Sequence, residues 1–257
     1  MTAPLAFDVR RFGSVDSTNT RCRELAEQGA GEGTLVVAAE QTGGRGRHGR
    51  QWHSPPGNFY GSLLLRPALA LADAASLSLV IGLAALDAVE ALAGRRLPVV
   101  VKWPNDLLLG RRKLAGILLE GVAEADGRCA WLVAGLGVNL ASHPDLPGHP
   151  STALAEEGIE GATVEAFLPA YLNALSRHLP VWQAKGFAPF RDAWLGRAAG
   201  LGQPVSLRIG DVAHGGILAD LSPDGSILIE SPLGCLQQFT AGELFFADAA
   251  DGTSGPA

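Results

Sequence analysis

The chain has 257 residues, of which 47% are hydrophobic and 18% charged, and its formal net charge is −6. This composition supports a sizeable core and excludes bulk disorder, and the acidic balance argues against a general nucleic-acid binder. The cysteines Cys22, Cys129 and Cys235 are odd in number and far apart, which suits a reducing compartment better than a disulfide framework. The N-terminus carries no signal-peptide pattern, so we expect a cytoplasmic protein without a membrane partner.

Up to residue 199, the chain alternates between predicted helices and strands. A short helix is predicted over 16–29, where capping residue types come first and glycine ends the run. A long helix is predicted at 74–93, and we expect it to be buried because its apolar run is too short to span a bilayer. Apolar, β-branched runs predict strands at 34–41, 58–65, 97–103 and 129–140. A hairpin is predicted over 106–121, and two further helices over 163–183 and 186–198.

The C-terminal part of the chain has a different pattern. From Leu201 the sequence consists of short apolar runs separated by turn residues, which is typical of a small closed β-unit. We therefore predict a larger domain over 1–199, a small β-domain over 200–247 and a disordered tail over 248–257.

The segment QTGGRGRHGRQW, at 41–52, places three arginines among four glycines in an acidic chain. Glycine disfavours helix and strand, so the segment predicts a flexible loop. Its formal G-x-G-x-x-G match fails as a dinucleotide motif, because Pro55 and Pro56 prevent the long helix that should follow. A solvated basic loop is the simpler alternative. Attachment to a core strand and the planar fork of arginine favour a small anionic ligand instead.

The segment VKWPNDLLLGRRKLAGILLEG, at 101–121, is the second candidate for chemistry. Pro104 keeps the preceding residue extended, so the strand ends by presenting Lys102, Asn105 and Asp106. Lys113 begins the returning strand, and Gly116 interrupts an apolar run at a point where a ligand could approach. A surface hairpin with solvated charges is the simpler interpretation of this segment when it is considered alone.

Two shorter segments give weaker signals. DSTN, at 16–19, is more readily a helix cap than a ligand clamp, and Asn139 in GLGVNL fits either a ligand contact or a turn. The histidines show no metal-ligand spacing, so no metal ligated by the protein itself is predicted, and no Ser-His-Asp arrangement is recognisable.

Taken in order, DSTN, EQTGGRGRHGRQWHSPPGNFY, KWPNDLLLGRRKLAGILLE and GLGVNL resemble the motifs of the biotin–protein ligases, or biotin–[acetyl-CoA-carboxylase] ligases. The resemblance implies an α+β fold, with a mixed β-sheet catalytic domain, packed helices of the class II synthetase type and a C-terminal SH3-like β-barrel. It implies that ATP, with Mg²⁺, activates biotin to biotinyl-5′-AMP. The biotin is then expected to pass to a specific lysine of a biotin carboxyl carrier protein.

The resemblance also assigns a role to each matching residue. Biotin contacts are implied for Ser17, Thr18, Asn19, Gln41, Arg45, Gly46, Arg47, Lys113 and Gly116. Contacts to ATP or the adenylate are implied for Arg47, Arg50, Trp52, Lys102, Asn105, Asp106, Lys113 and Asn139. The implied catalytic cations are Lys113, Arg45 and Arg47. The arginine loop, residues 43–50, is implied to cover biotinyl-AMP and to be disordered when empty.

Other functions are disfavoured by the same features. A lipoate–protein ligase or octanoyltransferase shares the implied fold, but the complete arginine loop argues against it. An Arg-Gly nucleic-acid-binding module is disfavoured by the acidic charge. The residues before DSTN are too few for the DNA-binding unit of bifunctional relatives, so we predict no DNA partner. A homodimer is compatible with the sequence.

Overall fold

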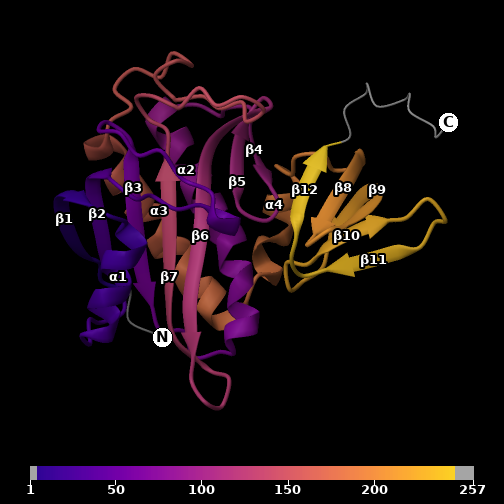
Figure 1. Cartoon of the computed structure of the whole chain (residues 1–257), viewed down its shortest axis with the longest axis horizontal. Helices are drawn as coiled ribbons and strands as arrows, with labels where there is room; N and C mark the ends of the chain where they lie inside the picture. Colours follow the sequence, from indigo (N-terminus) through magenta and orange to yellow (C-terminus); the bar gives the residue numbers. More distant parts are fainter. Residues whose placement is uncertain (1–4, 247–257) are drawn as a thin grey trace.

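The computed structural model describes residues 5–246, which form two β-sheets flanked by helices (Figure 1). The larger sheet consists of β1 (Asp8–Val15), β2 (Thr34–Gln41), β3 (Phe59–Leu65), β4 (Val99–Lys102), β5 (Asp106–Leu109), β6 (Arg112–Ala123) and β7 (Cys129–Val138). Its strand order is β1-β2-β3-β7-β6-β5-β4. Only the β1–β2 pair is parallel among the described pairings, so the sheet is mixed, as the resemblance implied.

The smaller sheet is formed by the C-terminal part of the described chain. Its strands are β8 (Pro204–Ile209), β9 (Val212–Leu221), β10 (Ile227–Glu230), β11 (Leu236–Phe239) and β12 (Glu243–Phe246). They pair antiparallel in the order β11-β10-β9-β8-β12. The α+β class with a separate all-β unit is therefore confirmed. Closure into an SH3-like barrel stays a prediction, as do the domain limits, and the predicted tail at 248–257 lies outside the described residues.

The helices are α1 (Thr18–Glu27), α2 (Leu77–Ala93), α3 (Val164–Lys185) and the short α4 (Arg191–Leu195). Three 3-10 turns accompany them, η1 (Arg47–Gly49), η2 (Leu71–Ser76) and η3 (Ala188–Phe190). The predicted single helix at 186–198 is wrong. Gly186 ends α3 with a φ of 65°, Pro189 lies within a separate 3-10 turn, and α4 stops at Gly196.

Two strands were missed by the sequence prediction. In β1, arginines and half-exposed positions blur the apolar alternation, because this strand forms the outer edge of the sheet and pairs only with β2. In β9, the pair Gly215–Gly216 lowers the β-propensity, and the strand is held by neighbours on both sides, β8 and β10. In both cases long-range pairing overrides a weak local signal.

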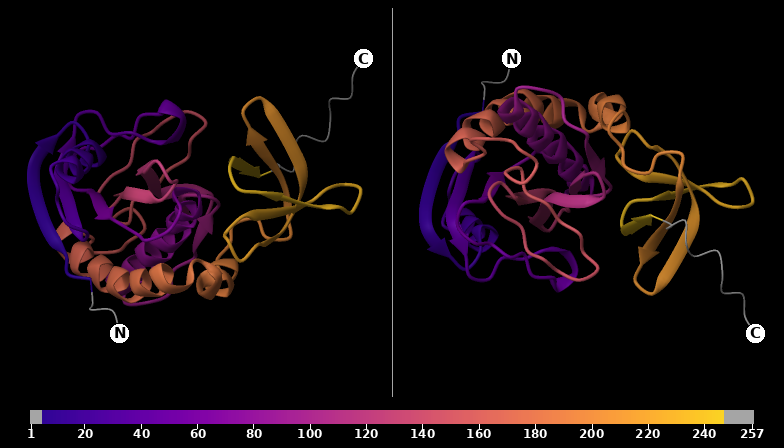
Figure 2. Two further views of the ribbon diagram at one scale, coloured as in Figure 1. Left: turned by 90° about the horizontal axis from the view of Figure 1, so that it is seen from below. Right: turned by 90° about the horizontal axis from the view of Figure 1, so that it is seen from above.

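Helices cover both faces of the larger sheet. On one face α1 packs against β2, β3 and β7, and on the other α2 and α3 pack together over the core (Figures 1 and 2). The helical stretch Leu71–Ala93 has 23 residues and is long and apolar enough to cross a membrane by length and composition, but 67% of its most apolar window is buried inside the molecule. The prediction of a buried helix is confirmed, but α2 begins only at Leu77, after the 3-10 turn η2. The expectation that the stretch is too short to span a bilayer is wrong.

Candidate active site

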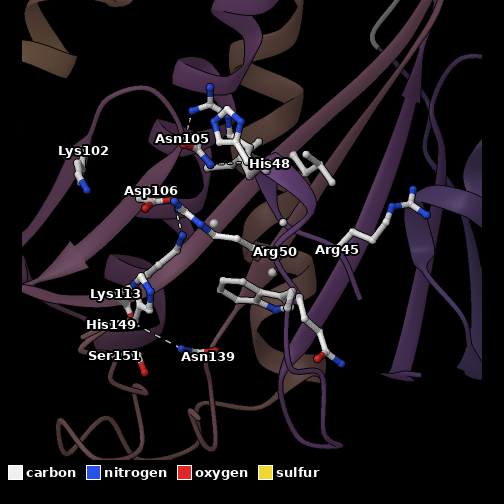
Figure 3. Close-up of a pocket in the computed structure, with 18 of the residues that line it drawn as sticks. Arg45, His48, Arg50, Lys102, Asn105, Asp106, Lys113, Asn139, His149 and Ser151 are labelled. Carbon is white, nitrogen blue, oxygen red and sulfur yellow. Dashed lines mark hydrogen bonds and ion pairs between the residues drawn. The ribbon is translucent and has the colours of Figure 1, made fainter. Parts of the chain in front are cut away.

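A cavity of about 560 Å³ lies over one end of the larger sheet (Figure 3). Residues of β12 in the smaller sheet complete its lining. Every residue that the sequence singled out lines it, from the start of α1, the arginine loop, the β5–β6 hairpin and the end of β7. The fold therefore brings these segments together, although the ligand contacts assigned to each residue stay predictions.

The floor of the cavity is formed by two glycines beneath a tryptophan. Gly116 of β6 and Gly137 of β7 lie opposite each other in the sheet. A Cβ atom on Gly137 would lie 2.6 Å from Trp52 Nε1, and one on Gly116 would lie 3.2 Å from the same indole. Glycine at both positions thus lets the indole lie close against the strands. Gly137 belongs to GLGVNL but was not predicted as a site residue.

A hydrogen-bond network occupies the cavity end beside α1. The Gln41 side-chain oxygen accepts from the backbone N–H and the hydroxyl of Thr18, at 2.8 and 3.0 Å. The Gln41 amide nitrogen donates to Ser54 Oγ at 2.8 Å. Ser17 occupies the N-cap position of α1 and is buried, yet its side chain makes no capping hydrogen bond. The DSTN segment therefore begins a helix and lines the cavity at the same time.

The arginine loop is folded across the cavity. Its backbone closes on itself through the Gly46 N–H, which donates to Arg50 O at 2.7 Å. Arg47 donates to Asn105 Oδ1 at 3.2 Å, and the Asn105 amide donates in turn to Ile117 O at 2.9 Å. Burial lowers the pKa of Arg47, and Asp106 acts against that shift. A partly desolvated guanidinium gains more from an anionic ligand than one in water does.

The loop also contacts the smaller sheet. Arg50 forms a bidentate ion pair with the carboxylate of Glu243 at the start of β12. The hydrogen bond from Arg50 lowers the pKa of Glu243 below the ordinary value for glutamate and raises that of Arg50. Glu243 was not predicted as a site residue, because nothing in its local sequence indicates a partner so far along the chain.

Two lysines lie near Asp106 at the β5–β6 hairpin. Lys113 Nζ lies 2.7 Å from Asp106 Oδ1 and 5.5 Å from the centre of the Trp52 ring. Lys102 lies against two aromatic rings of β12, and burial lowers its pKa, with Asp106 opposing that effect and Lys113 adding to it. Asp106 is thus the carboxylate that balances both cations.

Asn139 closes the site on the side of the segment 143–152. Its side-chain amide nitrogen donates to Thr152 O at 3.1 Å, and its backbone N–H donates to Leu114 O. Its Oδ1 is buried without a hydrogen-bond partner in the described part of the chain, as is Trp52 Nε1. Both residues line the cavity, and the resemblance implied nucleotide contacts for both of them.

The fold and the cavity together define an α+β protein with a cavity, lined by basic side chains, between its larger mixed sheet and its smaller all-β sheet. A family model described as the Biotin/lipoate A/B protein ligase family matches residues 12–139. With this match and the relatives described next, the chain belongs to that family.

The chain is similar to several curated and solved proteins. It is 42% identical to the biotin--[acetyl-CoA-carboxylase] ligase of Paracoccus denitrificans, over 90% of this chain and 97% of that protein. It is 35% identical to the bifunctional ligase/repressor BirA of Escherichia coli, over 91% of this chain and 73% of that protein. A biotin protein ligase from Aquifex aeolicus, solved in complex with biotin and ATP, matches with a TM-score of 0.80 and 30% identity, covering 93% of this chain and 99% of that one.

Proposed function

We propose that this protein uses ATP to activate biotin as biotinyl-5′-AMP and transfers the biotin to a lysine of a biotin carboxyl carrier protein. Its relatives over nearly the full length are named as biotin ligases, and a solved neighbour holds biotin and ATP together. The cavity, at about 560 Å³, is large enough for such a ligand pair.

The charge of the cavity carries this proposal. The whole chain is acidic, with a formal net charge of −6. The cavity nevertheless has two acidic side chains, Asp106 and Glu243, against six basic ones, Arg45, Arg47, Arg50, Lys102, Arg111 and Lys113. A local excess of positive charge within an acidic protein fits a ligand that carries several phosphates and a carboxylate.

The hairpin residues account for the activation step. A carboxylate and a phosphate repel each other, and the repulsion grows as the new P–O bond forms. Lys113 projects beside Trp52 and is held by Asp106, so its ammonium is already oriented when the anions bind. A cation fixed in this way stabilises the developing charge without reorganisation. Arg47, which contacts the neighbouring Asn105, supplies a second, partly desolvated charge.

Mg²⁺ fits the site only as a companion of the nucleotide. Within residues 5–246 no group of three or more His, Cys, Asp and Glu side chains could hold a metal ion. Mg²⁺ commonly takes one or two carboxylates together with substrate phosphates, and Asp106 is the lining carboxylate beside the two lysines. Mg²⁺ would supply charge neutralisation on the phosphates.

The remaining expectations concern partners and place. Family membership supports a carrier protein as the acceptor. The absence of DNA binding, a homodimeric state and a cytoplasmic location remain predictions from the sequence. Specific, biotin-dependent retention of a DNA duplex in a gel-shift assay at physiological salt would contradict the first of these.

Two measurements test the main proposal directly. In a calorimetric titration the protein should bind biotin. In an exchange assay it should incorporate labelled pyrophosphate into ATP only when biotin is present. Lipoate and octanoate, supplied at equal concentration, should not replace biotin. Exchange supported by lipoate or octanoate but not by biotin would instead show a lipoate or octanoate ligase of the same family.

A further inference from the structure

We propose that Glu120 is a positioning residue, which fixes the base of the arginine loop against the start of α1 and so keeps biotinyl-AMP in the site. This role presupposes the biotin ligase activity proposed above. Neither the motifs nor the resemblance assigns any function to this glutamate.

The carboxylate of Glu120 joins two segments that are far apart in the sequence. Glu120 lies on β6, opposite Val133 of β7. Both of its oxygens lie 3.0 Å from the same guanidinium nitrogen of Arg45. One of them also accepts from the side-chain amide of Asn19, at 2.7 Å. A single carboxylate thus holds the arginine loop and α1 together.

Arg45 acts in this arrangement as an anchor. Its other terminal nitrogen donates to Thr20 Oγ1 at 2.7 Å, and its backbone bridges Gln51 across the base of the loop. Figure 3 shows the Arg45 guanidinium directed away from Lys113 and Asp106. The geometry therefore favours a role in holding the loop over the catalytic role that the resemblance implied for Arg45.

Asn19 is constrained just as closely on the other side. Its amide nitrogen also donates to Leu118 O at 3.3 Å, and its oxygen accepts from Ser62 Oγ at 2.6 Å. A Cβ atom on Gly135 would overlap this side chain, so Asn19 lies directly on the sheet. Because both polar side-chain atoms of Asn19 are hydrogen-bonded within the protein, its orientation depends on Glu120, Ser62 and Leu118 O.

Removing the carboxylate would loosen the loop at its base. Hydrogen bonds that involve two charged groups are the strong ones, and Glu120 makes two of these to Arg45. The loop is rich in glycine, so an unanchored loop regains much conformational freedom. Arg47, two residues beyond the anchor, would then cover the ligand for a smaller fraction of the time.

The release rate of biotinyl-AMP from the full-length protein tests this role. Glu120→Ala should release preformed biotinyl-AMP about tenfold faster than the unaltered protein, by comparison with other residues that orient a ligand-binding group. Its thermal midpoint should fall by at most about 2–4 °C, as expected for the loss of a partly exposed ion pair, and the faster release should persist far below that midpoint, which a general loss of stability would not produce. Glu120→Gln keeps the volume but loses the charge, and it should show an intermediate rate. The matched control is Glu124→Gln, an exposed glutamate near the end of the same strand, which should behave like the unaltered protein.

A double substitution separates a shared contact from two independent ones. If Glu120 acts through Arg45, the double variant Arg45→Ala/Glu120→Ala should release the adenylate no faster than whichever single variant releases it faster. If the increases in release rate of the two single variants multiply in the double variant, this role is overturned. An unchanged release rate in folded Glu120→Ala would overturn it as well. If Glu120→Ala does not fold, the Glu120→Gln rate decides. Failure of the unaltered protein to form any biotinyl-AMP would instead contradict the proposed ligase function.

Discussion

The floor and the roof of the cavity are held in different ways. The floor consists of backbone: Gly116 and Gly137 pair within the sheet, and the indole of Trp52 lies on them. The roof consists of long side chains, and each arginine of the loop reaches a different element through the pairs Arg45–Glu120, Arg47–Asn105 and Arg50–Glu243. A floor made of paired strands is fixed by the core, whereas a roof held by three side-chain contacts can open when one of them is lost.

This contrast predicts that changes on the strands and hairpin cost more than changes in the loop. Lys113→Ala should have the largest effect, because Asp106 fixes its ammonium where we propose that the biotin carboxylate and the α-phosphate react. By comparison with other preorganised donors, biotin-dependent pyrophosphate exchange should fall by about 10²–10³-fold. Transfer from chemically supplied biotinyl-AMP should suffer less, because activation is then complete.

Two controls accompany that measurement. Arg112→Ala removes the neighbouring cation, which pairs with Glu157 away from the site, and should leave exchange intact. Lys102→Ala should also leave exchange comparatively intact. Near-normal exchange in Lys113→Ala, combined with its loss in Lys102→Ala, would place the catalytic cation on the other lysine.

The floor can be tested with a single methyl group. In Gly137→Ala the new Cβ would lie 2.6 Å from Trp52 Nε1, so the indole must move from its place over the strands. Adenylate affinity measured by calorimetry should fall roughly tenfold or more, since overpacking a fixed position costs about 1–3 kcal/mol. Gly13→Ala is the matched control on β1, where a Cβ would meet nothing within 4 Å. Equal affinities for the two variants would show that the floor tolerates a methyl group.

The roof should respond to ligand in a way that the floor does not. Residues 43–50 should exchange amide hydrogens faster without ligand than after biotinyl-AMP forms, because arginine–phosphate contacts then add to the few contacts that hold the glycine-rich loop. Arg47→Ala should remove most of that protection and release the adenylate faster. Hydrogen-exchange mass spectrometry measures this protection. Equal protection with and without ligand would contradict a loop that closes over its ligand.

The smallest effect is expected at the contact between the two sheets. Arg50 lowers the pKa of Glu243, so this pair contributes stability above the ordinary carboxyl pKa of 4.5 and loses it as the pH falls through the lower value of the folded state. Because Arg50 is about half exposed, the contribution should be at most about 1 kcal/mol. Glu243→Gln should therefore lower the thermal midpoint at neutral pH by at most about 2–4 °C. Glu230→Gln, at an exposed position on β10, is the control. If the thermal midpoints of the two variants differ by the same amount at every pH, the charge of Glu243 is not the cause.

Much of the architecture could be predicted from local patterns. The strands at 34–41, 58–65 and 129–140 and the helix at 74–93 were predicted correctly, because their apolar runs are buried on both sides. The edge strand β1 and the glycine-bearing β9 could not be predicted, since their stability comes from pairing with distant strands. The same reason explains the failed helix at 186–198, where a weak helical pattern lost to Gly186 and Pro189.

The sequence by itself determined the central residues of the cavity but not Gly137 or Glu243, because only the former cluster in short segments whose chemistry can be recognised locally. Only the tertiary structure decided what each of those side chains contacts. It turned Arg45 toward Glu120 and Arg47 toward Asn105, although the two arginines are two residues apart in one loop. It also brought Glu243 to Arg50 across 193 residues. The physical reason is that a charged side chain on a loop pairs with whichever opposite charge or polar group the fold brings close to it. The local sequence does not indicate which distant residue that will be.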